Sequence, residues 1–240
     1  MGVDFRDYDN DGREDIFVTA LTNERFSLFR NLGQGRFSDA SALSRISADS
    51  FPLSGWSTGV FDVNNDGFKD LFSANGNVND NAELTSSQKS RQPNAVFVNR
   101  GDGTFQVQTL PGEALYRGCA FGDFDRDGRM DLVVTRLNQR PTVLRNISDA
   151  SGHWIALRLI GTRSNRDGLG ALVRLVAPSG RQWNRATTSV GYAGSSDRIV
   201  HFGLGADTHA SLVEIEWPSG IKQQLHDVPA DRYLQVQESK

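Results

Sequence analysis

An acidic nine-residue segment occurs three times in this chain, and it restricts the possible folds more than any other feature. The copies are loop I (residues 7–15, DYDNDGRED), loop II (62–70, DVNNDGFKD) and loop III (123–131, DFDRDGRMD). In each copy an oxygen-bearing side chain stands at positions 1, 3, 5 and 9, and glycine stands at position 6. Because glycine permits a sharp turn with unusual backbone angles, these oxygens can converge on one centre. The sequence therefore predicts three cation sites.

The predicted ligands are all oxygens, and this favours calcium. A site without sulfur or imidazole is a poor match for zinc, iron or copper. Calcium accepts six to eight oxygens at roughly 2.3–2.6 Å in flexible geometry, whereas magnesium requires a strict octahedron and keeps its waters. We therefore expect up to three calcium ions, with the position 7 residue of each loop supplying only its main-chain carbonyl. The expected ligands are Asp7, Asp9, Asp11, Arg13 and Asp15 in loop I, Asp62, Asn64, Asp66, Phe68 and Asp70 in loop II, and Asp123, Asp125, Asp127, Arg129 and Asp131 in loop III.

The surroundings of the loops distinguish them from EF-hands. An EF-hand begins with the same DxDxDG pattern, but it needs a glutamate at position 12 and flanking helices. Position 12 is Val18, Ser73 or Val134 here, and each loop is followed by a run rich in β-branched and aromatic residues. Such runs are typical of strands. A solvated turn is the alternative explanation for a single copy, but a turn requires only one or two such residues, and all three copies share four oxygen positions.

The copies begin at residues 7, 62 and 123, and other features recur in phase with them. After each loop and its strand comes a further strand that contains asparagine (27–37, 95–105 and 142–147), and in the first two units a Gly-x-Gly turn leads into a fourth strand. A repeat of this length indicates an array, and four strands per unit are typical of a propeller blade. We predict an all-β fold with about three calcium-binding β-propeller blades in residues 1–148.

The loops, together with the stretch FRNLGQGRF (29–37), resemble the FG-GAP and VCBS repeat families. Members of these families form calcium-binding β-propellers like the head of integrin α-subunits. The resemblance implies an extracellular, adhesion-like interaction module whose calcium is structural. A propeller has four to eight blades, and the first unit here begins partway through its opening strand. We therefore expect a C-terminal fragment of a longer protein, with an unpaired sheet edge in the first blade.

A second pattern of alternating strands, with turn signals about every ten residues, begins at His153. Pro-Ser-Gly at 178–180 and at 218–220 predicts two hairpins, because proline presets one turn angle and glycine frees another. We expect a small β-sandwich-like domain over residues 151–240. The expected strands are 153–160, 171–177, 181–190, 198–203, 211–217 and 233–237.

This tail resembles the ASPIC/UnbV domain, which follows VCBS repeats in the cartilage acidic protein family and in many bacterial exported proteins. The stretches that carry the resemblance are 153–175, GSSD (194–197), HFGLG (201–205) and WPSG (217–220). The resemblance implies an extracellular or periplasmic location, although no signal peptide opens at Met1. It also leaves an alternative function open, that of an enzyme or accessory protein of bacterial biosynthesis.

Composition excludes some functions. The formal net charge is −3 and the basic residues are scattered, which argues against nucleic-acid binding. No apolar run approaches the roughly 18 residues of a membrane span. Cys119 is the single cysteine, so no internal disulfide can form, and we expect it to be a small buried residue. The expected partner is a protein or a carbohydrate.

No residue set matches a catalytic or cofactor-binding pattern, so the chain is not expected to be an enzyme. The GSSD stretch and His201 do not follow the GxSxG arrangement of hydrolases, and we interpret them as a polar turn, with ligand contact as the alternative. The SNRDGLG stretch (164–170) is expected to be a hairpin turn rather than a metal loop. Residues 75–94 form either a solvated excursion or a partner contact. Core packing is expected for the tryptophans, with polysaccharide binding as the alternative.

Overall fold

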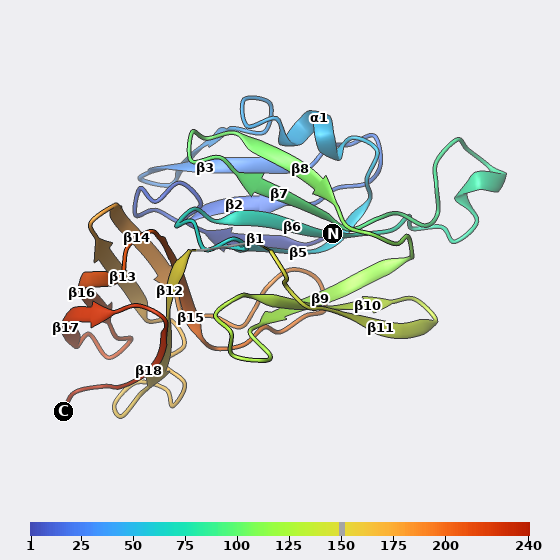
Figure 1. The fold of residues 1–240 in the computed structure, drawn as a ribbon. Helices are drawn as coiled ribbons and strands as arrows, with labels where there is room; N and C mark the ends of the chain where they lie inside the picture. The colour runs from blue at the N-terminus through green and yellow to red at the C-terminus, as the bar shows by residue number, and fades with distance from the viewer. Residues whose placement is uncertain (149–151) are drawn as a thin grey trace.

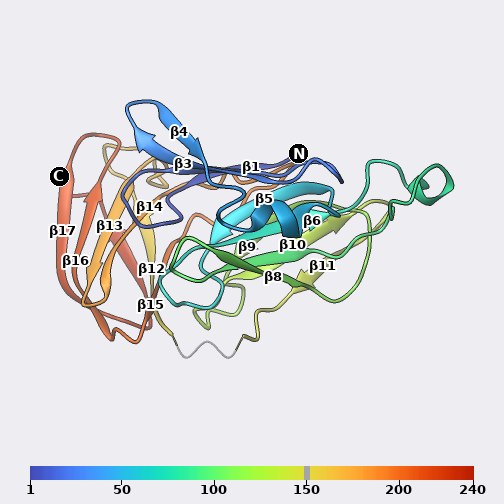
Figure 2. The same cartoon turned by 90° about the horizontal axis from the view of Figure 1, so that it is seen from above.

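The computed structural model describes residues 1–148 and 152–240, and these residues form an all-β molecule with two short helical segments (Figures 1 and 2). Among the described residues, no helix is both long enough and apolar enough to cross a bilayer. The strands make five sheets. The first sheet contains β1 (Val3–Arg6), β2 (Asp15–Val18), β3 (Ser27–Gly33) and β4 (Arg36–Asp39). The second contains β5 (Gly55–Phe61), β6 (Asp70–Asn75), β7 (Ala95–Asn99) and β8 (Phe105–Thr109). The third contains β9 (Tyr116–Gly122), β10 (Asp131–Arg136) and β11 (Gln139–Leu144).

Each of these three sheets is an antiparallel meander in chain order, and each acidic loop joins its first two strands. The predicted unit of strand, loop, strand and strand is therefore confirmed. The third sheet has three strands, in agreement with the sequence pattern. The first strands of the sheets, β1, β5 and β9, lie side by side (Figure 1), which is a β-propeller arrangement.

The sheets pack through apolar faces that the strand alternation creates. Phe17 of β2 and Leu28 of β3 point into a core shared with Leu71 and Phe97 of the second sheet. A second core joins the second sheet to the third around Phe121. The helix α1 (Ile46–Ser50), which the sequence did not predict, buries Ile46 in the first of these cores.

The opposite face of the first sheet is open and apolar. Val3 is 52% exposed and Phe5 is 46% exposed, and they pair across the strands with Val18 and Ile16 on the same face. β1 is the outer strand of its sheet, and from outside the sheet Gly191 N donates one main-chain hydrogen bond to the Val3 carbonyl at 3.1 Å. The expectation of an unpaired edge in the first blade stays a prediction.

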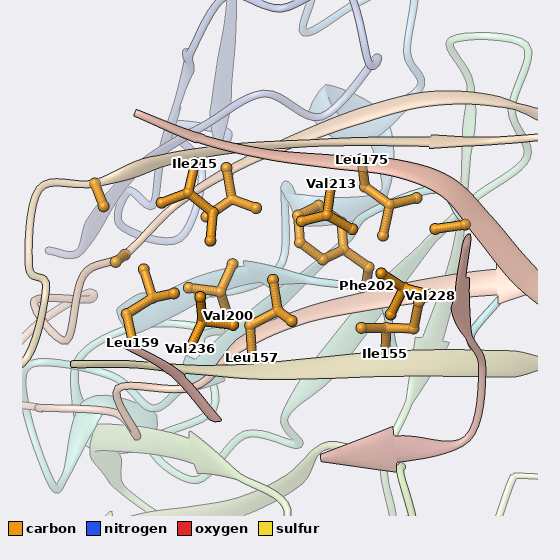
Figure 3. Packing of buried hydrophobic residues seen from close by; sticks show 14 of the residues in the cluster. Ile155, Leu157, Leu159, Leu175, Val200, Phe202, Val213, Ile215, Val228 and Val236 are labelled. Atoms are coloured by element: carbon orange, nitrogen blue, oxygen red, sulfur yellow. The ribbon is translucent and has the colours of Figure 1, made fainter. Parts of the chain in front are cut away.

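The tail contributes the other two sheets, which enclose one hydrophobic core in the manner of a sandwich (Figure 3). Isoleucines, leucines and valines from both layers meet around Phe202. Six of the seven strands correspond to expected ones, and the seventh, β17, completes the second predicted hairpin. The strands are β12 (His153–Ile160), β15 (Val200–Gly205) and β18 (Arg232–Gln237) in one sheet, and β13 (Leu172–Ala177), β14 (Gly180–Arg185), β16 (His209–Glu216) and β17 (Lys222–Pro229) in the other.

The strand expected at 181–190 is too long, because β14 ends at Arg185. Residues 186–199, which we call the central loop, leave the sandwich and run along the first strands of all three blades. Besides the bond from Gly191 to β1, Tyr192 N donates to Ser57 Oγ of β5 at 3.1 Å, and Asp197 N donates to the Phe121 carbonyl of β9 at 2.9 Å. The tail thus contacts the first strand of each of these three sheets.

The expectation of a hairpin turn at SNRDGLG is also wrong. Residues 164–170 lie in the connection between β12 and β13, which belong to different sheets. Glu238 fixes this crossover, since its carboxylate accepts hydrogen bonds from the main-chain N–H groups of Thr162, Arg163 and Ser164 at 2.7, 2.7 and 2.8 Å. Burial alone would raise the pKa of Glu238, but these bonds and two serine hydroxyls hold it well below its usual value.

The remaining expectations concern single features. Cys119 is buried, as predicted. Trp217 and Trp154 are buried, as expected for core packing, whereas Trp56 and Trp183 are only half-buried. The insertion at 75–94 contains the 3-10 helix η1 (Ala82–Leu84) and projects from the blades at the right of Figure 1. The expected boundary at 148–151 falls largely outside the described residues, and the division into two domains stays a prediction.

Candidate metal loops

The three acidic loops have the same internal hydrogen bonds, which begin at position 1. In loop I the carboxylate of Asp7 accepts from Asp11 N at 3.2 Å and from Gly12 N at 2.8 Å. Asp62 accepts from the corresponding groups of loop II at 3.2 and 2.8 Å, and Asp123 from those of loop III at 3.1 and 2.6 Å. The position 6 glycines have φ values between 86° and 93°, where a side chain would be strained.

The position 9 carboxylate ties each loop to the third strand of its own sheet, or in loop III to Asn146, just beyond the end of β11. Asp15 accepts hydrogen bonds from Tyr8 N at 3.1 Å and from Asn31 N at 2.7 Å. Asp70 and Asp131 have equivalent partners, and their bonds to Asn99 N and Asn146 N are both 2.7 Å. The asparagine that ends the sequence pattern of each unit is therefore part of the loop structure.

Carboxylate oxygens converge in loops I and III. Those of Asp7, Asp9 and Asp15 lie within 4.8 Å of one another, and those of Asp123, Asp125 and Asp131 do likewise. These two clusters could hold a metal ion. Loop II has the same backbone arrangement, but Asn64 offers an amide oxygen at position 3. The position 5 carboxylates accept hydrogen bonds from the position 7 N–H groups, at distances of 2.8–3.0 Å. Metal coordination by the main-chain carbonyls of Arg13, Phe68 and Arg129 stays a prediction.

Two arginines that the sequence reasoning did not select lie against these clusters. Arg30 Nε is 2.6 Å from Asp9 Oδ2, and Arg145 Nε is 2.7 Å from Asp125 Oδ2. Both precede the third-strand asparagine, where loop II has Val98 instead. The recurrence of arginine before asparagine was the available signal.

Burial affects the pKa values of the more deeply placed carboxylates. It raises the pKa of Asp15 and that of Asp62 to about 7 each, and it raises the pKa of Asp70 well above its usual value. A cation bound at the loop favours the ionised carboxylates, because opposite charge lowers a carboxyl pKa. Without a cation, these groups carry protons more readily in the folded state than in the unfolded state.

This difference predicts an unusual pH dependence of stability in chelator. A carboxyl group with a raised pKa in the folded state stabilises the fold at low pH, and that contribution is lost as the pH rises through the folded value, here about 7 for Asp15 and Asp62. We therefore expect the melting temperature in EDTA to rise when the pH is lowered from 8 to 6. In saturating calcium the same change should lower it. Calorimetric scans at both pH values check this, and parallel curves in the two media would contradict it.

Neighbouring loops are bonded to each other. The side chain of Asn10 donates to the Gly67 carbonyl of loop II at 2.9 Å, and that of Asn65 donates to the Gly128 carbonyl of loop III at 3.0 Å. A return set of bonds comes from the third strands: Asn99 donates to the Tyr8 carbonyl at 3.1 Å, and Asn146 donates to the Val63 carbonyl at 2.7 Å. The three loops therefore form one continuous hydrogen-bonded row.

The tail contacts every loop in this row. Trp183 of β14 packs against Gly12, and the neighbouring Arg185 Nε is 2.7 Å from Glu14 Oε1. Gly205 N donates to the Asn65 carbonyl of loop II at 2.8 Å. Tyr233 of β18 donates its hydroxyl to Asp123 Oδ2 of loop III at 2.6 Å. All three loops are thus in direct contact with the tail.

A small cavity of about 50 Å³ lies between the blades and the tail, which is room for a few waters. Lys69 and His201 line it, and burial lowers the pKa of both. His201 Nε2 is 3.0 Å from the Gly128 carbonyl, and Ser196 Oγ accepts from Phe121 N at 3.1 Å. Ser196 and His201 are near each other in sequence, but they contact two different main-chain groups of the third unit. Ser196 contacts Phe121 N, and His201 contacts the Gly128 carbonyl.

Comparison with known proteins identifies both halves of the chain. Residues 7–73 and 62–134 match the model of the FG-GAP-like repeat, and these spans include all three loops. The chain belongs to the FG-GAP-like repeat family. Residues 161–240 match the model described as ASPIC and UnbV, so this FG-GAP chain ends in an ASPIC/UnbV domain, and both resemblances seen in the sequence are confirmed.

Relatives share this combination over most of the chain. Human cartilage acidic protein 1 is 31% identical over 232 residues, which cover 91% of the chain and 33% of the relative. The mouse protein of the same name is 29% identical over 91% of the chain and 34% of the relative. The FG-GAP chain therefore spans about a third of the length of these relatives.

Proposed function

We propose that this FG-GAP protein is a calcium-binding extracellular interaction module in which calcium has a structural role. The observation that carries the proposal is the convergence of the carboxylates of Asp7, Asp9 and Asp15, repeated at the same positions of loop III. Hard oxygen ligands in this number suit calcium better than transition metals. The extracellular location is supported by the relatives named cartilage acidic protein 1. Millimolar calcium outside cells would keep sites of extracellular affinity filled.

The structural role is supported by the position of the loops. Each one joins two strands, is bonded to the next loop and contacts the tail, so a cation there would fix the blades relative to one another. A role as an enzyme or accessory protein of biosynthesis is the alternative. It would require a set of titratable groups around a substrate-sized pocket. The cavity between blades and tail, at about 50 Å³, is smaller than such pockets, and the larger groove on the outer face of the β14-β13-β16-β17 sheet holds its charged side chains in ion pairs.

Calorimetric titration tests the proposal. The calcium-stripped chain should bind about three calcium ions, and magnesium at the same concentration should not displace them. The position 3 variants D9N, N64A and D125N should each remove or weaken one binding event while circular dichroism shows an unchanged fold. Absence of calcium binding by a folded chain would overturn the proposal.

The loops should differ in affinity. Loops I and III carry four aspartates, whereas Asn64 replaces one charged ligand in loop II by a neutral amide. Affinity follows ligand charge, so we expect loop II to bind calcium more weakly than the other two. Titration of double variants that leave one loop intact measures each site. Arg30 and Arg145 offset part of the negative charge of loops I and III. The variants R30M and R145M should therefore widen the difference in calcium affinity between these loops and loop II. Equal affinities of the three loops in these variants would contradict the ranking.

A further inference from the structure

A groove of about 500 Å³ crosses the outer face of the sheet β14-β13-β16-β17. This volume lies in the range of roughly 300–1,000 Å³ that is typical of ligand sites. Strand alternation creates the groove lining: Val173 and Val213 point into the sandwich core, whereas Arg174 and Glu214, the next residues, point outward. No loop carboxylate lines the groove, although Trp183 at its end also touches Gly12 of loop I.

The lining is organised in rows across the strands. The register places Trp183, Arg174, Glu214 and Gln224 opposite one another on four successive strands. Arg174 forms an ion pair with Glu214, and Gln224 Nε2 donates to Glu214 Oε1 at 2.6 Å. The nitrogen Nε of Arg174 is buried and has no hydrogen-bond partner. A buried donor without a partner is unusual in a folded protein.

The adjacent row has the same character. It contains Leu172, Glu216 and Lys222, and Lys222 Nζ is 3.4 Å from Glu216 Oε2. The two basic and two acidic side chains of the groove are therefore paired with each other. The groove has no net charge, and it combines these paired charges with the apolar side chains of Trp183, Leu172 and Ile215.

We propose that this groove binds a neutral oligosaccharide. Sugar hydroxyls both donate and accept hydrogen bonds, which suits a lining of paired charges and an amide, while the C–H faces of a sugar suit an indole. A polyanionic glycan or nucleic acid would meet the two glutamates without an excess of basic groups. A β-strand peptide would need an unpaired strand edge, whereas the main chain at this face is already paired within the sheet.

The test uses the full chain in millimolar calcium on an array of neutral, sulfated and uronic-acid glycans. Calorimetry then follows with a neutral hexasaccharide, such as xylohexaose, mannohexaose or cellohexaose. We expect binding to at least one neutral series and at least a tenfold loss of affinity in Q224A and W183A. H226A is the matched control, because His226 lies on the same face of β17 but outside the groove, and it should bind like the unaltered chain.

Three results would overturn the inference. They are no binding to any neutral glycan, binding only to charged glycans, and neutral-glycan binding that Q224A and W183A leave unchanged. W183A removes a contact with loop I, so Q224A, whose side chain lies away from the blades, separates a lost sugar contact from a displaced tail. Calcium titration of the same variants keeps this inference distinct from the proposed function, since calcium binding should persist in Q224A whatever the sugar result.

Discussion

Removal of calcium should lower the melting temperature of this chain by roughly 10 °C. A ligand that binds only the folded state stabilises it by mass action, and a site with a dissociation constant near 0.1 mM in 1 mM calcium contributes about 1.4 kcal/mol. Three such sites contribute about 4 kcal/mol, and 1 kcal/mol corresponds to about 2–4 °C in a chain of this size. The loops also bond to one another and to the tail, so we expect a single cooperative transition to shift. Differential scanning calorimetry in calcium and in EDTA measures the shift.

A variant of loop III separates the metal from the rest of the loop. D125N removes a charged ligand from the cluster, but Asp125 is 39% exposed and its ion pair with Arg145 is at the surface, where such pairs contribute little. The melting temperature of D125N should therefore fall by about 3–6 °C in calcium and by less than about 1 °C in EDTA. D80N, a change at an exposed aspartate outside the loops, is the control. Equal losses in both media would show that Asp125 contributes to stability without a metal.

The sequence predicted the loops and the blade strands well, because the signals for them are local. Four oxygen positions and a glycine recur at fixed spacing, and Gly12, Gly67 and Gly128 have the backbone angles that this spacing implied. Runs rich in β-branched and aromatic residues identified the strands that follow each loop. The hydrogen bonds of Asp7 and Asp15 show why the pattern is strict, since each carboxylate also holds the main chain of its own loop.

The contacts between units could not be predicted in the same way. The asparagine at position 4 of loop I carries no local sign that it binds the Gly67 carbonyl of loop II, which is 57 residues away. The length of β14 was overestimated for the same reason, since Ala186 to Val190 continue an alternating pattern but bury Val190 among the blades. Glu238 fixes the 162–164 segment across a separation of about 75 residues.

The glycine-rich sequence of the central loop had no explanation until the tail was seen against the blades. Gly191 lies so close to β5 that a Cβ atom would be 2.4 Å from Ser57 Oγ and 2.5 Å from the Thr58 carbonyl oxygen. At Gly194 a Cβ atom would be 2.0 Å from the Cys119 carbonyl oxygen. Glycine is therefore required at these positions, because the main chain of the central loop packs directly against the strands of the blades. The GSSD stretch (194–197), which the sequence analysis interpreted as a polar turn, also forms a contact between the two halves of the chain.

G194A should displace the central loop from the third blade. Gly194 does not have a left-handed φ, so the effect of the new methyl group is steric rather than conformational, and the atom that it meets belongs to the backbone and cannot rotate away. Overpacking of this kind costs about 1–3 kcal/mol, which corresponds to a loss of roughly 3–10 °C in melting temperature. The loop covers Cys119, whose side chain is only 2% exposed, so its displacement should also open that thiol.

Thiol labelling reports this displacement directly. Burial raises the pKa of Cys119 to about 12, so the unaltered chain should react very slowly with a thiol reagent at pH 8. We expect G194A to react at least ten times faster. G103A is the matched control: a Cβ atom at Gly103 meets nothing within 4 Å, so its left-handed φ should cost about 1 kcal/mol without exposing the thiol. If G194A melted and reacted like G103A, the central loop would not be the element that joins the tail to the blades. The link between the acidic loops and the tail would then have to rest on the other contacts, such as those of Trp183, Arg185, His201, Gly205 and Tyr233.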